Sequence, residues 1–132
     1  MNELASRRAQ LAACLLLAAA TAIGAFAAHA LKAHLSADRF AVLQTAVLYQ
    51  FIHALGLLVL GVLAGQRQVR GLAAAMALLF AGVLLFSGSL YLLLCGAPRL
   101  LGVLTPMGGL CLIAGWSLAA FSLWREARGR KA

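Results

Sequence analysis

Acidic residues are almost missing from this chain. Its 132 residues include only three of them, Glu3, Asp38 and Glu126, against eleven lysines and arginines. All three lie outside the long apolar runs. General acid–base catalysis and proton-coupled transport commonly use carboxylates held inside the protein. The scarcity therefore argues against a conventional hydrolase and against a cation-coupled transporter with a buried carboxylate.

Charge of either sign is scarce, at 11% of residues, whereas hydrophobic residues make up 64%. A soluble domain carries about 25% charged residues, and a soluble chain this short has too little interior to hide the apolar excess. The composition predicts an integral membrane protein with the lipid bilayer as its first partner. The net charge of +8 is spread between the apolar runs and at the chain ends, so nucleic acid is not an expected partner.

Metal and nucleophile motifs are also absent. The three cysteines, Cys14, Cys95 and Cys111, lie within apolar runs without C-x-x-C spacing, which indicates neither a disulfide framework nor a zinc site. The sequence contains no H-E-x-x-H, no glycine-rich phosphate loop and no nucleophile–base–acid set;. We therefore expect no enzyme activity, no metal and no cofactor.

What the chain does have is four uncharged apolar runs. They predict membrane spans at about 9–28, 40–65, 71–95 and 105–124, because about 20 apolar residues in a helix cross the hydrocarbon core. Backbone groups in lipid must find partners within their own segment, so each run should be helical. The expected fold is an all-α, polytopic four-transmembrane-helix bundle, a single domain over 1–132. We expect Ser36 to be the N-cap of the second helix, Gly96, Ala97 and Pro98 to end the third, and Thr105 with Pro106 to start the fourth;.

The distribution of Lys and Arg predicts the orientation. One side of the bundle carries Arg7, Arg8, Arg67, Arg70, Arg125, Arg128, Arg130 and Lys131; the other carries Lys32, Arg39 and Arg99. By the positive-inside rule both termini face the cytoplasm of a bacterial inner membrane. A secretory signal ending at Ala28-His29-Ala30 is the alternative for residues 1–30, although the apolar run is longer than a usual signal core.

A polar stripe lies at the middle of the second run. His53 is near the bilayer midplane, Tyr49 and Gln50 precede it by four and three residues, and Thr45 lies one turn earlier;. The third run offers facing polar groups, and the whole candidate cluster is Tyr49, Gln50, His53, Ser87, Ser89 and Tyr91. It could be a proton relay or a polar ligand pocket. The favoured interpretation is a hydrogen-bond network between helices that fixes packing and register.

A second polar group is predicted at the outer end of the first two helices: His29, Lys32, His34, Asp38 and Arg39. Two histidines and an aspartate could bind a metal there, but their spacing matches no recognised site, and an interfacial polar turn is favoured. A bis-histidine haem is not expected, since His29 and His53 lie at different depths.

Small residues form ridges on three of the runs. Gly61 and Gly65 make a G-x-x-x-G pair, Gly82 and Gly88 narrow the third helix, and Cys111, Gly115 and Ala119 follow one face of the fourth. Such ridges let membrane helices approach closely. They could close the bundle or form a homo-oligomer, and the sequence leaves both open.

Four stretches in this order resemble a known family: Gly24–His29 (GAFAAH), Tyr49–Ala54 (YQFIHA), Leu85–Tyr91 (LFSGSLY) and Leu104–Gly109 (LTPMGG). The chain resembles the YgdD/YwdK-like family, a domain of unknown function found in small bacterial inner-membrane proteins and similar to eukaryotic transmembrane protein 256. One departure is Ala27, where the family pattern has glycine. The resemblance implies four helices, an uncleaved first helix and no established activity. It also places these polar positions in the family's motifs: His29, Tyr49, Gln50, His53, Ser87, Ser89, Tyr91, Thr105 and Pro106.

Three functions follow as hypotheses. The leading one is a non-enzymatic inner-membrane protein that packs with itself, with lipid or with a membrane partner. The second is a small transporter or proton-conducting bundle that uses His53. The third is binding of an apolar ligand, such as a quinone or lipid, between the helices.

Overall fold

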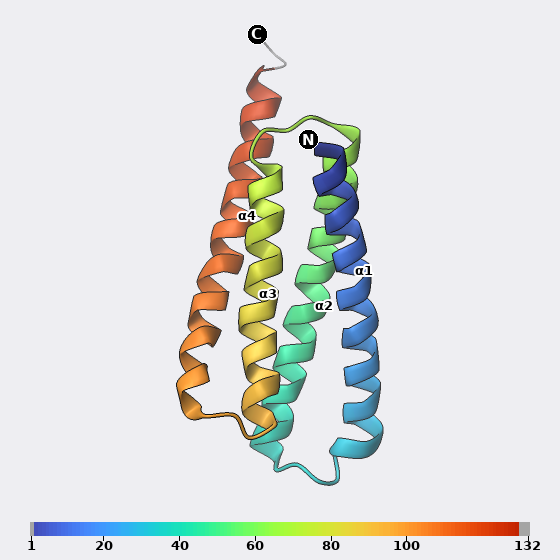
Figure 1. Ribbon diagram of the computed structural model, residues 1–132, viewed down its shortest axis with the longest axis vertical. Helices are drawn as coiled ribbons and strands as arrows, with labels where there is room; N and C mark the ends of the chain where they lie inside the picture. The colour runs from blue at the N-terminus through green and yellow to red at the C-terminus, as the bar shows by residue number, and fades with distance from the viewer. Residues whose placement is uncertain (1, 130–132) are drawn as a thin grey trace.

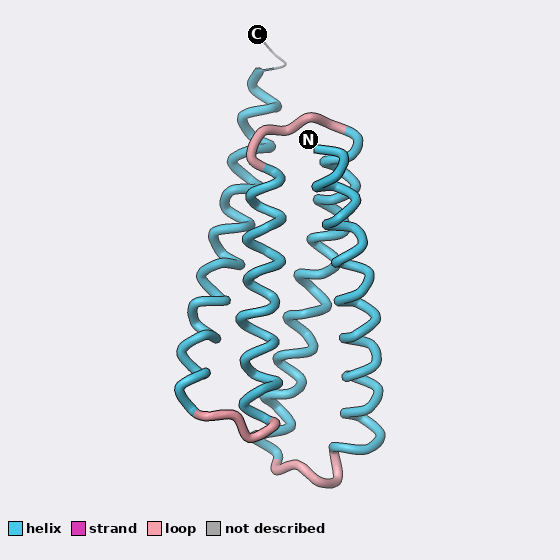
Figure 2. Tube along the Cα trace, viewed as in Figure 1, coloured by secondary structure: helices cyan, strands magenta, loops and turns pink. Residues whose placement is uncertain are grey.

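The chain folds into long antiparallel helices, as the computed structural model shows for residues 2–129 (Figures 1 and 2). The helices are α1 (Asn2–Phe26), α2 (Ala37–Gln66), α3 (Leu72–Leu94) and α4 (Leu104–Gly129). A π-helical turn, η1 (Ala27–Leu31), continues α1, and a 3-10 turn, η2 (Arg99–Val103), precedes α4. No strand occurs within these residues. All four helices are long and apolar enough to cross a membrane, which confirms the expected all-α class with four transmembrane helices.

The start of α2 and the end of α3 carry the signals that the sequence predicts. The Ser36 hydroxyl accepts a hydrogen bond from the backbone N–H of Arg39 at 3.4 Å, so Ser36 is the N-cap of α2. At the end of α3, Gly96 has a φ of +90°. Its N–H bonds to the carbonyl of Leu93, and the N–H of Ala97 bonds to that of Leu92. This pair of bonds is the Schellman motif, which needs a left-handed residue at that position.

The start of α4 differs from the prediction. Thr105 is not the N-cap, because helical backbone already runs through η2 and α4 begins at Leu104. Pro106 is the third residue of α4 and not its first. The Thr105 hydroxyl instead lies 2.7 Å from the hydroxyl of Ser89 on α3. The threonine therefore joins two helices rather than starting one.

The helices pack in chain order. α1 lies against α2, α2 against α3, and α3 against α4, while α1 and α3 share only a narrow contact. In Figure 1, α1 and α4 form the two sides of the bundle. The start of α1, the α2–α3 connection and the end of α4 lie at one end, which we call the basic end. The other end holds the connections between α1 and α2 and between α3 and α4.

Small residues bring the neighbouring helices together. A Cβ on Gly65 would lie 2.8 Å from the hydroxyl of Ser6, so α1 fits into the G-x-x-x-G notch of α2. A Cβ on Gly82 would meet the side chain of Leu112, and one on Gly115 that of Leu79. The ridges of α2, α3 and α4 thus close the bundle from inside. This explains most of the ridge pattern without a second copy of the chain.

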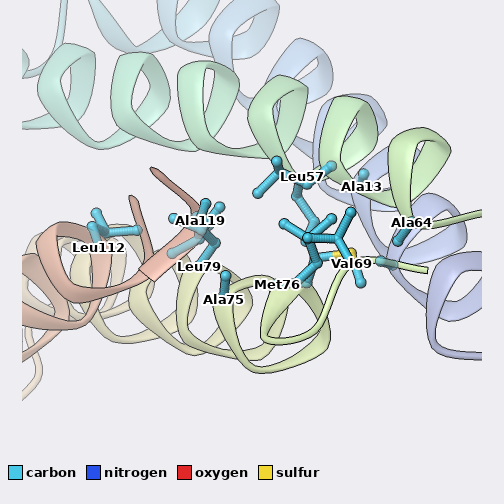
Figure 3. Packing of buried hydrophobic residues seen from close by; sticks show 13 residues of the cluster. Ala13, Leu57, Ala64, Val69, Ala75, Met76, Leu79, Leu112 and Ala119 are labelled. Carbon is cyan, nitrogen blue, oxygen red and sulfur yellow. The ribbon is translucent and has the colours of Figure 1, made fainter. Parts of the chain in front are cut away.

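The apolar core lies between these contacts, toward the basic end (Figure 3). Leu57, Leu72 and Leu79 are its largest fully buried apolar side chains. Many other large apolar side chains point outward; Leu11, for example, is 64% exposed and Ile113 65%. Such a surface is stable only against hydrocarbon.

Candidate functional site

Gln50 is the central member of the predicted midplane cluster. Its side chain is 4% exposed. The amide nitrogen donates to the carbonyl of Leu16 on α1 at 2.7 Å, and the amide oxygen accepts from the hydroxyl of Tyr91 on α3 at 2.7 Å. One glutamine of α2 therefore links three helices at membrane depth.

The serines of α3 point in two directions. Ser87 donates to the backbone carbonyl of Ala46 on α2 at 2.7 Å. Ser89 donates to the carbonyl of Phe86 at 2.9 Å and faces Thr105 of α4. The structure thus brings Ser87 and Tyr91 to α2, but places Ser89 between α3 and α4.

His53 belongs to an aromatic set rather than to the glutamine network. Tyr49 stacks on His53 with ring centroids 5.6 Å apart and on Phe86 at 4.5 Å. Trp116 of α4 lies 6.4 Å from the His53 ring. It can approach because Gly56 leaves room, where a Cβ would meet the indole ring at 2.4 Å. These rings lie where α2, α3 and α4 meet.

The tautomer of the neutral His53 ring follows from its one hydrogen bond. Nδ1 lies 2.7 Å from the carbonyl oxygen of Tyr49. A carbonyl only accepts, so Nδ1 donates and the neutral ring carries its lone pair on Nε2. No described residue hydrogen-bonds to Nε2. His53 is otherwise well covered, at 8% exposed. Thr45, in contrast, is exposed and bonds only to the carbonyl of Ala41 in its own helix.

One buried polar contact was not predicted from the sequence. Ser6 is 1% exposed and donates to the carbonyl of Gly61 at 2.7 Å, while Gln10 donates to the Ser6 hydroxyl at 2.9 Å. Ser6 precedes the first predicted span, so nothing marked it as buried. The glycine spacing on α2 was the only available signal. It showed that something packs closely there, but not what.

The fully covered polar atoms of the bundle are all hydrogen-bonded in the part that the structure describes. Among residues 2–129, no fully covered side-chain nitrogen or oxygen lacks a partner, while Nε2 of His53 and the hydroxyl of Ser122, which have no described partner, keep some exposure. The interior polar contacts join helices or return to the backbone of their own helix, apart from the bond between Gln10 and Ser6 within α1. The arrangement is what a network that fixes helix packing requires.

The outer polar group is exposed throughout: His29, Lys32, His34, Asp38 and Arg39. Only Arg39 reaches another helix, donating to the carbonyl of Leu94 at the C-terminus of α3. A cation there complements the helix dipole. Within residues 2–129, no three His, Cys, Asp or Glu side chains come close enough to hold a metal ion.

Two apolar grooves open on the surface. One, about 370 Å³, lies between α1 and α3 near the basic end, and its lining includes Arg8, Ala9 and Phe80. The other, about 380 Å³, lies between α1 and α2 near the opposite end, with Gly24 and Phe51 in its wall. None of the residues of the midplane cluster lines either groove.

Comparison with known proteins agrees with this architecture. A family described as "Protein of unknown function (DUF423)" matches residues 23–109. The UPF0382 membrane protein SH2409 of Staphylococcus haemolyticus is 45% identical over 102 residues, 77% of this chain and 83% of that protein. This chain belongs to that family.

Other members are the UPF0382 membrane protein YwdK of Bacillus subtilis and the UPF0382 inner membrane protein YgdD of Escherichia coli K12. YwdK is 41% identical over 74% of this chain and 80% of its own length, and YgdD 39% over 74% of each. No solved structure matches the chain. The family resemblance expected from the four motifs is confirmed, and all four lie within the matched residues. The family is of unknown function, and nothing in it indicates an enzymatic activity.

Proposed function

We propose that this chain is a non-enzymatic inner-membrane protein that acts through contacts of its outer surface with lipid or with another membrane protein. The observation that supports this most directly is the saturated interior, in which no fully covered side-chain nitrogen or oxygen of residues 2–129 lacks a partner. A catalytic or transport site needs polar groups free to exchange partners. The apolar surface, in contrast, is extensive and open.

The polar residues then have a structural task. Hydrogen bonds between membrane helices contribute about 0.6 kcal/mol each, which is too little to drive association but enough to choose among registers. Gln50 reaches both α1 and α3, so a slip of either helix would break a bond. We assign the network to fixing the order and register of the bundle.

The basic end is the proposed cytoplasmic end. The last turns of α4 support this, because Arg128 lies 4.9 Å from the ring centroid of Trp124 and Arg125 5.6 Å from that of Phe121. Aromatic rings beside arginines are typical of the interface between lipid and cytoplasm. Both the start of α1 and the end of α4 then face the cytoplasm.

Thiol labelling tests the orientation. In a background with the three native cysteines changed to alanine, Ala33→Cys places one thiol in the α1–α2 connection and Gln68→Cys one in the α2–α3 connection, both exposed positions. We expect a membrane-impermeant maleimide to label residue 33 in intact spheroplasts and residue 68 only after the membrane is opened. The reverse pattern would place the basic end outside.

A second candidate function rests on His53. The lone pair of its Nε2 has no described partner. It could therefore accept a proton, or a hydrogen bond from the hydroxyl of an apolar ligand such as a quinol;. Tyr49 and Trp116 beside it are each 39% exposed, so the aromatic set is reachable from the lipid.

Proton flux in reconstituted vesicles separates the two functions. Under the leading proposal, we expect wild type, His53→Ala and protein-free vesicles to leak protons at the same rate, because the described side-chain hydrogen bonds do not continue from His53 to either end of the bundle. His34→Ala, a change at an exposed histidine of the outer turn, is the matched control. A wild-type flux that disappears only in His53→Ala would establish the second candidate and reject the first.

A further inference from the structure

The groove between α1 and α3 has a floor and two walls. Its floor contains Leu57 of α2, 1% exposed, and Met76 of α3, 3% exposed. In Figure 3, Leu57 and Met76 lie together in the core. The volume of about 370 Å³ falls within the range of small-molecule sites, about 300–1,000 Å³. An elongated apolar group could lie in it.

The groove exists because alanines line both walls. On α1 they are Ala5, Ala9 and Ala12, and on α3 they are Ala73 and Ala77. These positions are three or four residues apart, so each set follows one helix face. α2 lies between the two helices and holds them apart. Side chains as short as alanine cannot fill the space that remains.

Among the described residues of the lining, Arg8 is the only charged one. The nearest acidic residue along α1 is Glu3, and its carboxylate is paired with Arg7 at 2.7 Å. Arg8 forms no ion pair with any described carboxylate. Arg8, with its unpaired guanidinium, therefore lines the groove near the basic end, and the groove extends along α3 to Phe80, toward the middle of the bilayer.

These features match one kind of molecule. We propose that the α1–α3 groove binds an anionic phospholipid of the cytoplasmic leaflet, with an acyl chain against Leu57 and Met76 and the phosphate at Arg8. Basic pockets between transmembrane helices on the cytoplasmic side bind such headgroups, and arginine pairs well with phosphate. The proposal rests on the proposed function, in which the outer surface contacts lipid, and specifies the class of lipid.

Fluorescence quenching tests the site directly. The native tryptophans, Trp116 and Trp124, are changed to phenylalanine, and Phe80→Trp places a reporter in the groove. The protein is reconstituted in phosphatidylcholine vesicles that contain phosphatidylglycerol, with either lipid carrying brominated acyl chains. We expect an apparent preference of the groove for phosphatidylglycerol of about fivefold, because one arginine near the surface contributes about 1 kcal/mol of attraction to anionic lipid.

The neighbouring arginine provides the matched control. Arg8→Gln should abolish the preference, whereas Arg7→Gln, which removes the same charge one residue away and outside the groove, should leave it. Ala77→Leu should fill the groove and lower quenching by both lipids. Equal effects of Arg7→Gln and Arg8→Gln would reduce the site to general surface charge and overturn the proposal. So would an absence of quenching by either lipid, as expected if a second copy of the chain covers the groove.

A second measurement uses the unsubstituted chain. In native mass spectrometry from detergent with equal amounts of the two lipids, we expect phosphatidylglycerol to be retained preferentially, and equal retention would contradict the site. Either failure removes the lipid site alone. The proposed function fails separately, by the appearance of proton flux through His53.

Discussion

Gly108→Ala is expected to destabilise the bundle by about 3 kcal/mol, the upper part of the usual range for overpacking. A Cβ at this position would lie 2.4 Å from the backbone nitrogen of Phe86 and 2.9 Å from the carbonyl carbon of Leu85. Backbone atoms cannot rotate away as a side chain can. The methyl group can be accommodated only if α4 moves away from α3, with loss of packing along the whole pair.

The adjacent glycine is the matched control for this change. A Cβ on Gly109 would find only Cδ2 of Phe86, at an ordinary 3.9 Å. Alanine is favoured over glycine inside a helix by about 1 kcal/mol, so Gly109→Ala should be neutral or slightly stabilising. Unfolding in mixed detergent–SDS micelles, followed by tryptophan fluorescence, measures both variants. Equal stability of the two would show that α3 and α4 are not in close contact at Gly108.

The contacts of the other glycines bear on self-association. The sequence left open whether the small-residue ridges serve the bundle or a dimer, and the structure uses Gly61, Gly82 and Gly115 inside the bundle. Gly88 differs, because a Cβ there would meet nothing within 4 Å. Most of the ridge pattern therefore gives no support for a homo-oligomer.

The architecture could be predicted because it depends on quantities that the sequence displays directly. Uncharged runs long enough to cross lipid leave the backbone no alternative to helix. Signals that act within a few residues predicted helix ends correctly. Ser36 marks the start of α2, and Gly96 marks the end of α3. Thr105 was predicted wrongly because the preceding 3-10 turn already supplies helical backbone. A threonine before proline is a sound cap signal only where the chain before it is extended.

The polar cluster could be predicted in part. Helical spacing correctly put Tyr49 and His53 together, and they stack. It could not give the partners, because these depend on which helices are neighbours and on how far one is shifted along the other. Trp116 illustrates the difficulty: it reaches α2 only because Gly56 leaves a notch there, and no pattern within either helix relates the two.

The largest effect expected within the polar cluster is that of Gln50→Leu. The change removes the bonds to α1 and α3 and leaves the hydroxyl of the half-buried Tyr91 without its partner on α2. An unpaired buried polar group costs about 1–3 kcal/mol, so we expect a loss of about 2 kcal/mol in the free energy of unfolding, measured in the same micelles. The matched control is Gln44→Leu. Gln44 is exposed on the same helix and forms no described side-chain hydrogen bond, so its replacement should be neutral.

A double variant then distinguishes a structural network from a working site. Tyr91→Phe alone should destabilise the bundle, because it leaves the amide oxygen of Gln50 without a hydrogen-bond donor. Gln50→Leu with Tyr91→Phe removes both partners, and replacing both can be nearly neutral. We therefore expect the double variant to be more stable than the sum of the single losses predicts. Strict additivity would show that the two side chains do not act as a pair in the membrane. In that case the network would not fix the register of α2 against α3, and the saturated interior would lose its weight as the argument for a non-enzymatic protein.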